Sequence, residues 1–258
     1  MPEPYLCADD IVVRFGGLTA VDQVSVSVDR GETVGIIGPN GAGKSTLFGA
    51  ILGTVGTAAG SVTLAGTKIS TWPAHRRAQA GLGRTFQKLE LFGSMTVREN
   101  LEFGTEAPTL GARPWRLLSR NRHVATDDAA LLAAELGLEP YLDQVTASLP
   151  IGVRRLVEFG RALCARPSIL LLDEPSSGLD ETETRQFADH IAHATRSTSI
   201  GVLLVEHDMS LVLSICERIY VLDFGKLIAS GTPAEIQRSP VVREAYLGGA
   251  ALGATDDS

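Results

Sequence analysis

A glycine-rich turn between a strand-like run and a helix-like run constrains this chain more than any other feature. Residues 33–37 form a short apolar β-prone run, and residues 45–52 have helical character. The junction contains the phosphate-loop pattern GxxxxGK followed by Ser or Thr, which chance produces in about one chain in a hundred of this length. The residues concerned are Gly38, Pro39, Asn40, Gly41, Ala42, Gly43, Lys44, Ser45 and Thr46. We therefore predict nucleotide binding here rather than an ordinary glycine-rich turn.

The chemistry of phosphate binding explains each residue type in this loop. Glycines let successive backbone N–H groups curl around a phosphate, and the following helix points the positive end of its dipole at the same anion. We expect Lys44 to reach the β- and γ-phosphates of the nucleotide. The Ser45 hydroxyl is expected to bind Mg²⁺.

A phosphoryl-transfer site also needs acids at the end of a buried strand. The apolar run at residues 169–172 ends in Asp173 and Glu174. Asp173 is expected to hold magnesium directly or through water, and Glu174 to be the base that polarises the attacking water. Taken alone, these acids fit an exposed strand end equally well. Their pairing with the phosphate loop favours the catalytic interpretation.

The first half of the chain combines strand-like and helix-like patterns. Alternating apolar residues at 11–15 and 24–28, separated by a double glycine, indicate a β-rich start. Residues 105–149 are rich in Ala, Leu, Arg and acids, which indicates a helical insertion, with residues 131–142 reading as an amphipathic helix.

The second half returns to alternating strands and helices. The continuously apolar runs at 169–172 and 202–205 are typical of parallel strands covered on both faces. Strand-like runs at 218–223 and 225–230 follow, and a polar helical tail is predicted at 233–247. The fold class is therefore α/β.

Composition and charge exclude several other classes of protein. With 44% hydrophobic and 21% charged residues the chain is globular, and a net charge of −7 argues against nucleic acid as a partner. The cysteines Cys7, Cys164 and Cys216 are too far apart to predict a disulfide framework or a zinc site. The N-terminal residues carry acids and prolines where a signal peptide needs a basic start, and no apolar run approaches the roughly 18 residues of a membrane span. We expect any membrane role to be peripheral.

An ordered series of further motifs is similar to the nucleotide-binding subunit of ABC transporters, over about residues 6–248. Residues 84–87 (RTFQ) stand at the Q-loop position, and residues 149–153 (LPIGV) at the signature position. After the acids of the Walker B strand come residues 177–180 (SGLD) as a D-loop, and then His207.

This resemblance implies a P-loop NTPase core of the ABC ATPase type, with an N-terminal antiparallel β-subdomain and an inserted α-helical signature subdomain. It implies one ATPase domain over residues 1–258. Its parts are residues 1–87 and 168–230 as the catalytic core with the β-subdomain, residues 88–167 as the helical subdomain and residues 231–258 as a C-terminal tail.

The resemblance also assigns roles to single residues. Gln87 would sense Mg²⁺ and the attacking water and couple the site to a membrane partner. His207 would contact the γ-phosphate and help to hold Glu174 and water in place. Asp180 would lie at a dimer interface. Phe15 matches the aromatic position that stacks on adenine, with a core aromatic residue as the alternative.

The signature departs from the usual LSGGQ or LSYGQ. Pro150 replaces the serine that donates to the γ-phosphate of the opposite subunit, and Val153 replaces glutamine. A helix can still begin there, because proline is tolerated in the first helical turn, so the Gly152 N–H can still face the phosphate. Losing one charge-assisted donor weakens binding by about 1.5–3 kcal/mol. We therefore hypothesise a working but weakened composite site.

Other stretches resemble the ATPases of branched-chain or hydrophobic amino-acid importers. They include RFGGLTAVDQVS at residues 14–25 and LFGSMTVRENL at residues 91–101, and residues 141–148 lack the TxVGxxG-like segment of many exporters. In that class the ATPase binds ATP and Mg²⁺ at the cytoplasmic face of the cell membrane. Its partners are two transmembrane permease subunits, a second ATPase subunit that is identical or different, and indirectly an extracytoplasmic solute-binding protein.

The same motifs fit several alternative functions. Related ATPases drive urea or amide uptake or lipopolysaccharide-type export, and nothing in these residues reads the solute. A non-transport ABC ATPase would usually have two cassettes or long heptad insertions, neither of which is present. A regulatory module without hydrolysis conflicts with the intact Glu174 and His207. We expect Arg154, Arg155 and Arg161 to form a solvated or interface face without a catalytic part.

Overall fold

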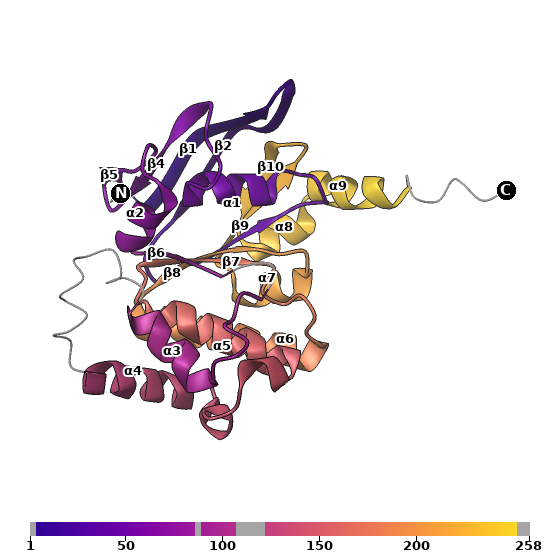
Figure 1. The fold of residues 1–258 in the computed structure, drawn as a ribbon. Helices are drawn as coiled ribbons and strands as arrows, with labels where there is room; N and C mark the ends of the chain where they lie inside the picture. Colours follow the sequence, from indigo (N-terminus) through magenta and orange to yellow (C-terminus); the bar gives the residue numbers. More distant parts are fainter. Residues whose placement is uncertain (1–3, 86–88, 107–121, 252–258) are drawn as a thin grey trace.

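Two β-sheets and the helices around them make up the computed structural model, which describes residues 4–85, 89–106 and 122–251. The four-stranded sheet has the order β2-β1-β4-β5, and the six-stranded sheet the order β10-β9-β3-β8-β7-β6. In Figure 1 the six-stranded sheet crosses the middle of the molecule, with the four-stranded sheet on one side and α3 to α6 on the other. The predicted α/β class, with an antiparallel β-region and a helical insertion, is confirmed.

The N-terminal sheet is antiparallel throughout. Its strands are β1 (Leu6–Phe15), β2 (Leu18–Val28), β4 (Ala59–Leu64) and β5 (Thr67–Lys68). β1 pairs with β2 through the tight turn after Phe15, and with β4 on its other edge. The alternating residues of β1 and β2 bury one face of this sheet, which confirms the predicted β-rich start.

The central sheet is parallel except at one edge. Its strands are β3 (Thr33–Ile37), β6 (Leu82–Arg84), β7 (Ile169–Asp173), β8 (Gly201–Val205), β9 (Arg218–Asp223) and β10 (Lys226–Gly231). Only the pairing of β10 with β9 is antiparallel. The apolar side chains of β7 belong alternately to the two hydrophobic clusters on opposite faces of the sheet, Leu171 to one and Leu170 to the other. A strand covered on both faces has to be apolar at every position, as these runs are.

Helices cover both faces of the central sheet. They are α1 (Lys44–Leu52), α2 (Ala74–Gln79), α3 (Val97–Glu106), α4 (Arg122–Glu135), α5 (Ile151–Cys164), α6 (Glu181–Thr198), α7 (Met209–Ile215), α8 (Pro233–Arg238) and α9 (Pro240–Ala251). Two short 3₁₀ turns, η3 (Glu139–Tyr141) and η4 (Thr146–Ser148), lie between α4 and α5. Within the described ranges no helix combines the length and apolar character needed to cross a membrane.

Two predicted helices differ from the observed ones. The helix expected over residues 131–142 ends at Glu135, because Gly137 has a φ of +67° that a right-handed helix does not allow. The tail expected as one helix is divided into α8 and α9, since Ser239 caps the end of α8 in an extended conformation before Pro240.

The strand order brings the chemically important loops to one edge of the sheet. The phosphate loop follows β3, the acids Asp173 and Glu174 stand at the end of β7, and His207 lies just beyond β8. β8 separates β3 from β7 in the sheet. All three strands are parallel, so their carboxyl ends meet at the same edge, where open α/β sheets usually bind ligands.

Candidate nucleotide-binding site

The phosphate loop needs glycine where neighbouring backbone comes close. Gly43 has a φ of +97°, and a Cβ atom there would lie 2.5 Å from the carbonyl oxygen of Ala20. Gly38 also has a positive φ, and its Cβ would collide with the Leu222 carbonyl. The backbone of β2 at Ala20 and of β9 at Leu222 therefore restricts the path of the loop, and only glycine fits at these two positions.

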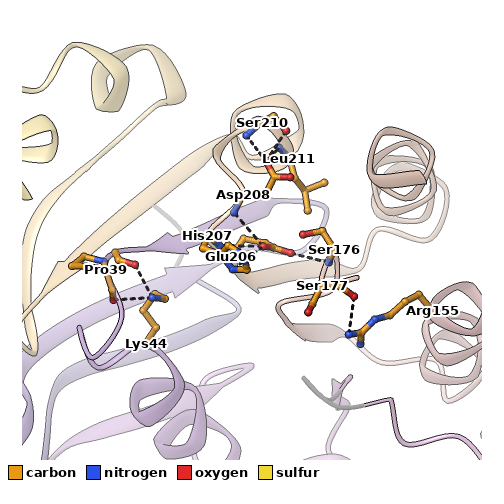
Figure 2. Close-up of polar contacts among 11 residues, drawn as sticks. Pro39, Lys44, Arg155, Ser176, Ser177, Glu206, His207, Asp208, Ser210 and Leu211 are labelled. Atoms are coloured by element: carbon orange, nitrogen blue, oxygen red, sulfur yellow. Dashed lines mark hydrogen bonds and ion pairs between the residues drawn. The ribbon is translucent and has the colours of Figure 1, made fainter. Parts of the chain in front are cut away.

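Lys44 lies buried at the start of α1, with its side chain turned back onto the loop (Figure 2). Its Nζ donates hydrogen bonds to the carbonyl oxygens of Gly38 at 2.6 Å and Pro39 at 3.0 Å. Burial lowers the pKa of Lys44, while Glu174 and Asp173 act in the opposite direction. An ammonium group whose partners are neutral carbonyl oxygens is well prepared to exchange them for phosphate oxygens.

A hollow of about 650 Å³ opens beside the phosphate loop. This volume lies within the range of about 300–1,000 Å³ that small-molecule sites usually have. Its lining residues come from the β1–β2 turn, the phosphate loop and α1, the end of β7, and the β9–β10 turn. They are Phe15, Leu18, Thr19, Ala20, Asn40, Gly41, Ala42, Gly43, Lys44, Ser45, Thr46, Glu174, Phe224 and Gly225.

Phe15 lies in this hollow rather than in a hydrophobic core. It is 54% exposed at the end of β1, so the alternative of a core aromatic residue is wrong. Phe224, which the sequence patterns did not single out, is a second exposed ring at the rim. A two-residue Phe-Gly hairpin turn with both φ angles positive places it there, and such a turn between strand-like runs is the only signal that pointed to this position.

The acids at the end of β7 have contrasting environments. Burial, followed by the charge of Glu174, raises the pKa of Asp173, and Arg84 only partly offsets this. The Asp173 Oδ1 atom is buried and has no hydrogen-bond partner among the described residues. A buried carboxylate oxygen of this kind suits a divalent cation such as Mg²⁺. Glu174 has a φ of +46°, uncommon for a residue other than glycine, and its N–H donates to the Val205 carbonyl oxygen at 2.9 Å.

His207 points into solvent at the end of β8, beside a buried acid (Figure 2). Its side chain is 60% exposed, and its Nδ1 is 3.9 Å from Oε2 of Glu206. Glu206 itself is fully buried and accepts hydrogen bonds from the backbone N–H groups of Ser176, His207 and Asp208. The sequence interpretation missed Glu206, although an acid directly after a continuously apolar strand is the same signal that identified Asp173.

The signature and D-loop residues lie together, away from the hollow. Gly152 is buried in the first turn of α5, where a Cβ atom would be 2.5 Å from Oε1 of Glu183. Asp180 caps α6 by accepting hydrogen bonds from the N–H groups of Thr182 and Glu183, each at 2.8 Å. Neither Gly152 nor Asp180 lines the hollow of its own chain. Gln87 lies outside the described residues.

The expectation of a solvated arginine face on α5 is wrong for Arg155. This residue is 5% exposed, forms an ion pair with Glu158 at 3.3 Å, and donates from Nη2 to the Ser177 carbonyl oxygen at 3.2 Å. Arg161 donates to the Glu90 carbonyl oxygen. Arg155 is enclosed because α5 packs against α3 and α4 as well as the central sheet.

Two family models and several individual proteins match this chain. Residues 21–177 match the family described as ABC transporter, and residues 226–251 match the family described as branched-chain amino acid ATP-binding cassette transporter. The high-affinity branched-chain amino acid transport ATP-binding protein LivG of Salmonella typhimurium is 38% identical, covering 96% of this chain and 99% of that protein. The lipopolysaccharide export system ATP-binding protein LptB of Escherichia coli is 37% identical, covering 94% and 97%.

A solved structure of an ABC transporter cassette is also similar to this chain. An ATP-binding cassette of an ABC transporter, solved in its ADP conformation, matches with a TM-score of 0.84 and 30% sequence identity, covering 95% of this chain and 99% of that one.

Proposed function

This chain belongs to the ABC transporter family, and from that membership we propose that it is the ATP-hydrolysing subunit of an importer for branched-chain or other hydrophobic amino acids. Overall sequence identity does not separate import from lipopolysaccharide export, because LivG is 38% identical to this chain and LptB is 37% identical to it. The observation that carries the proposal is the match of the C-terminal segment, residues 226–251, to the branched-chain amino acid cassette family.

The hollow beside the phosphate loop is the proposed ATP site. Its backbone N–H groups and Lys44 bind the β- and γ-phosphates, and the exposed ring of Phe15 stacks on the adenine. The Lys44 ammonium exchanges its bonds to two loop carbonyls for bonds to phosphate oxygens. ATP binding therefore breaks two bonds from Lys44 to carbonyl oxygens, and no N–H donor of the loop is lost.

Ser45 and Asp173 are the proposed ligands of Mg²⁺, which when bound neutralises charge on the phosphates. Glu174 accepts a proton from water as the water oxygen attacks the γ-phosphorus, and the bond from that phosphorus to the bridging oxygen of ADP breaks. The exposed His207 contacts the γ-phosphate and holds the water. The role of Gln87 at the same site rests on the family resemblance.

The proposed assembly contains a second ATPase subunit, identical or different. Gly152 and Asp180 do not line their own hollow, which supports a site completed by the signature of another chain. Two transmembrane permease subunits hold the ATPase pair at the cytoplasmic face of the membrane as a peripheral component. An extracytoplasmic solute-binding protein acts through the permeases, and nucleic acid is not a partner.

The proposed division of the chain follows the same lines. Residues 1–87 and 168–230 are the catalytic core with the β-subdomain, and residues 88–167 are the helical subdomain. Residues 231–258 are the C-terminal tail.

The test is to purify the complex from its own cells through a tag on this chain and to place it in lipid vesicles. We expect two permeases, a second ATPase and a solute-binding protein, and we expect ATP hydrolysis to rise when that binding protein is loaded with leucine or valine. Lys44→Ala in this chain should abolish the rise, while Lys68→Ala, at an exposed lysine of β5, should not. Copurification of a lipid-export permease instead would contradict the importer proposal and favour the export alternative.

A further inference from the structure

Buried charged side chains hold the start of the D-loop, at Ser177 and the residue before it, from two sides. On one side the Ser176 N–H donates to Oε1 of Glu206 at 2.9 Å. On the other side Nη2 of Arg155 donates to the carbonyl oxygen of the next residue, Ser177, at 3.2 Å. Figure 2 shows Glu206 and Arg155 reaching this loop from opposite directions, Glu206 from the end of β8 and Arg155 from α5.

The Glu206 carboxylate joins the D-loop to the His207 segment. Besides Ser176 it accepts from the N–H groups of His207 at 3.1 Å and Asp208 at 3.4 Å. Its side chain is 0% exposed, so water does not compete for these bonds. Hydrogen bonds to a buried ionised acceptor are about twice as strong as neutral ones, and one carboxylate thus fixes two loops that are 30 residues apart in sequence.

Arg155 joins the same loop to the segment that follows Gln87. Its Nη1 is paired with Oε2 of Glu158 at 3.3 Å, and both side chains are buried. Oε1 of Glu158 in turn accepts from the N–H of Glu90 at 3.3 Å. A continuous series of hydrogen bonds therefore runs from Glu90 through α5 to the D-loop.

We propose that Glu206 and Arg155 are positioning residues for ATP hydrolysis, which together hold the Ser176–Ser177 backbone in a fixed place between His207 and the signature helix. Neither side chain lines the hollow, so neither touches the nucleotide in its own chain. Their effect is to make the position of His207, the D-loop and the segment around Glu90 depend on one another. This inference rests on the proposed ATPase function. It adds that two buried side chains hold the separate loops of the site in fixed positions relative to one another.

The test uses Glu206→Gln in the full-length chain and in the purified transporter. Glutamine has nearly the same size, but its NH₂ group must face a backbone N–H on one side, so at least one hydrogen bond is lost. We expect kcat for ATP hydrolysis by the transporter to fall about tenfold or more, the factor expected for one charge-assisted hydrogen bond. The affinity of the isolated chain for a fluorescent ATP analogue should change by less than about threefold.

Hydrogen exchange gives a readout that does not depend on hydrolysis. In Glu206→Gln the peptides covering residues 174–180 and 206–211 should exchange faster, while those of α1 should not. Arg155→Lys should speed exchange in the first of these peptides only, because lysine cannot bridge Glu158 and Ser177 with a planar fork. The matched controls are Glu217→Gln, at an exposed acid after α7, and Arg154→Lys, at the neighbouring arginine of α5.

Unchanged kcat and unchanged exchange in Glu206→Gln would overturn the inference. So would a loss of ATP affinity equal to the loss of kcat, because the defect would then lie in the hollow. If Glu206→Gln does not fold, Arg155→Lys supplies the same comparison. Failure of the wild-type transporter to hydrolyse ATP would instead refute the proposed function, and the exchange measurements on the isolated chain would still test the contacts themselves.

Discussion

The buried carboxylate of Asp173 at the end of β7 suits a bound cation but costs stability in the nucleotide-free chain. The pKa of Asp173 is raised by burial and by the nearby carboxylates of Glu174 and Glu206. A carboxyl group whose pKa is higher in the folded chain than in the unfolded chain favours folding at low pH, and that contribution is lost as the pH rises through the folded-state pKa. Above its folded-state pKa, the charge of Asp173 therefore destabilises the nucleotide-free chain.

Replacing this carboxylate by a neutral isostere should make the nucleotide-free chain more stable. We expect Asp173→Asn to raise the unfolding temperature at pH 7 by about 2–4 °C, the size of shift that ~1 kcal/mol produces in a domain of this length. The advantage should shrink as the pH falls below the folded-state pKa of Asp173, where the wild-type group is neutral too. Thermal unfolding at several pH values, with and without Mg²⁺ and ATP, measures both effects. A variant less stable than wild type at pH 7 would contradict this account.

The exposed ring of Phe15 should affect binding but not stability. Phe15→Ala should weaken ATP binding by an amount typical of one base stacked on an aromatic ring, about 1–3 kcal/mol, while unfolding changes by less than about 0.5 kcal/mol. Phe15→Tyr should retain wild-type affinity. The comparison variant Phe224→Ala removes the second exposed ring of the hollow. Equal affinities for Phe15→Ala and wild type would exclude stacking on Phe15.

Single residues could be predicted from the sequence where their neighbours in the chain define their chemistry. Lys44 and Glu174 belong to short local patterns, and the structure places both at the hollow. Glu206 follows an apolar run just as Asp173 does, but its role could not be assigned, because one of its partners is the backbone N–H of Ser176, far away in sequence. Arg155 was misjudged for a related reason, since its burial depends on helices that pack over α5.

At the scale of single elements, patterns located the helices but not their ends. The apolar spacing of α4 continues past the point where Gly137 turns the chain, so the predicted helix was too long. A helix was predicted to begin near Pro150 with the proline in its first turn, and α5 does begin there, at Ile151, with Pro150 just before the first turn. Pro150 occupies the N-cap position of α5 and makes no side-chain capping bond.

A substitution at Pro150 tests directly whether the missing serine hydroxyl weakens the signature. Pro150 has a φ of −55° and a ψ of 155°, which serine adopts freely. In Pro150→Ser the gain from capping, about 0.5–2 kcal/mol, opposes the loss of proline rigidity, about 0.4–1 kcal/mol. We therefore expect stability to change little. ATP hydrolysis by the assembled transporter should increase, because the hydroxyl restores a donor for the phosphate across the interface.

Pro150→Ala is the control for that experiment, since it removes the ring without adding a hydroxyl. Its rate should not exceed the wild-type rate. If the serine and alanine variants hydrolyse ATP equally fast, the missing donor does not limit this transporter.

At the scale of the whole molecule, the fold places Gly152 and Asp180 away from the hollow beside the phosphate loop. The α/β class could be predicted from the order of apolar runs, but the strand order could not, because side-chain patterns do not specify which parallel strands are neighbours. That order places β8 between β3 and β7 and so gathers the phosphate loop, the acids and His207 at one edge. Gly152 and Asp180 instead lie at the starts of α5 and α6, where each contacts Glu183.

This separation predicts that ATP binding belongs to one chain and hydrolysis to two. Gly152→Ala should leave the affinity of the isolated chain for ATP unchanged within about twofold, because Gly152 does not line the hollow. In the assembled transporter the added methyl group must displace the Glu183 carboxylate, which accepts from the Asp180 N–H at 3.0 Å. Moving that carboxylate breaks its bond from the Asp180 N–H and loosens the D-loop cap, so hydrolysis should fall while binding persists. Gly56→Ala, where a Cβ meets no atom within 4 Å, is the matched control. Loss of ATP affinity in the isolated Gly152→Ala chain would show instead that the signature acts on the phosphate loop of its own chain.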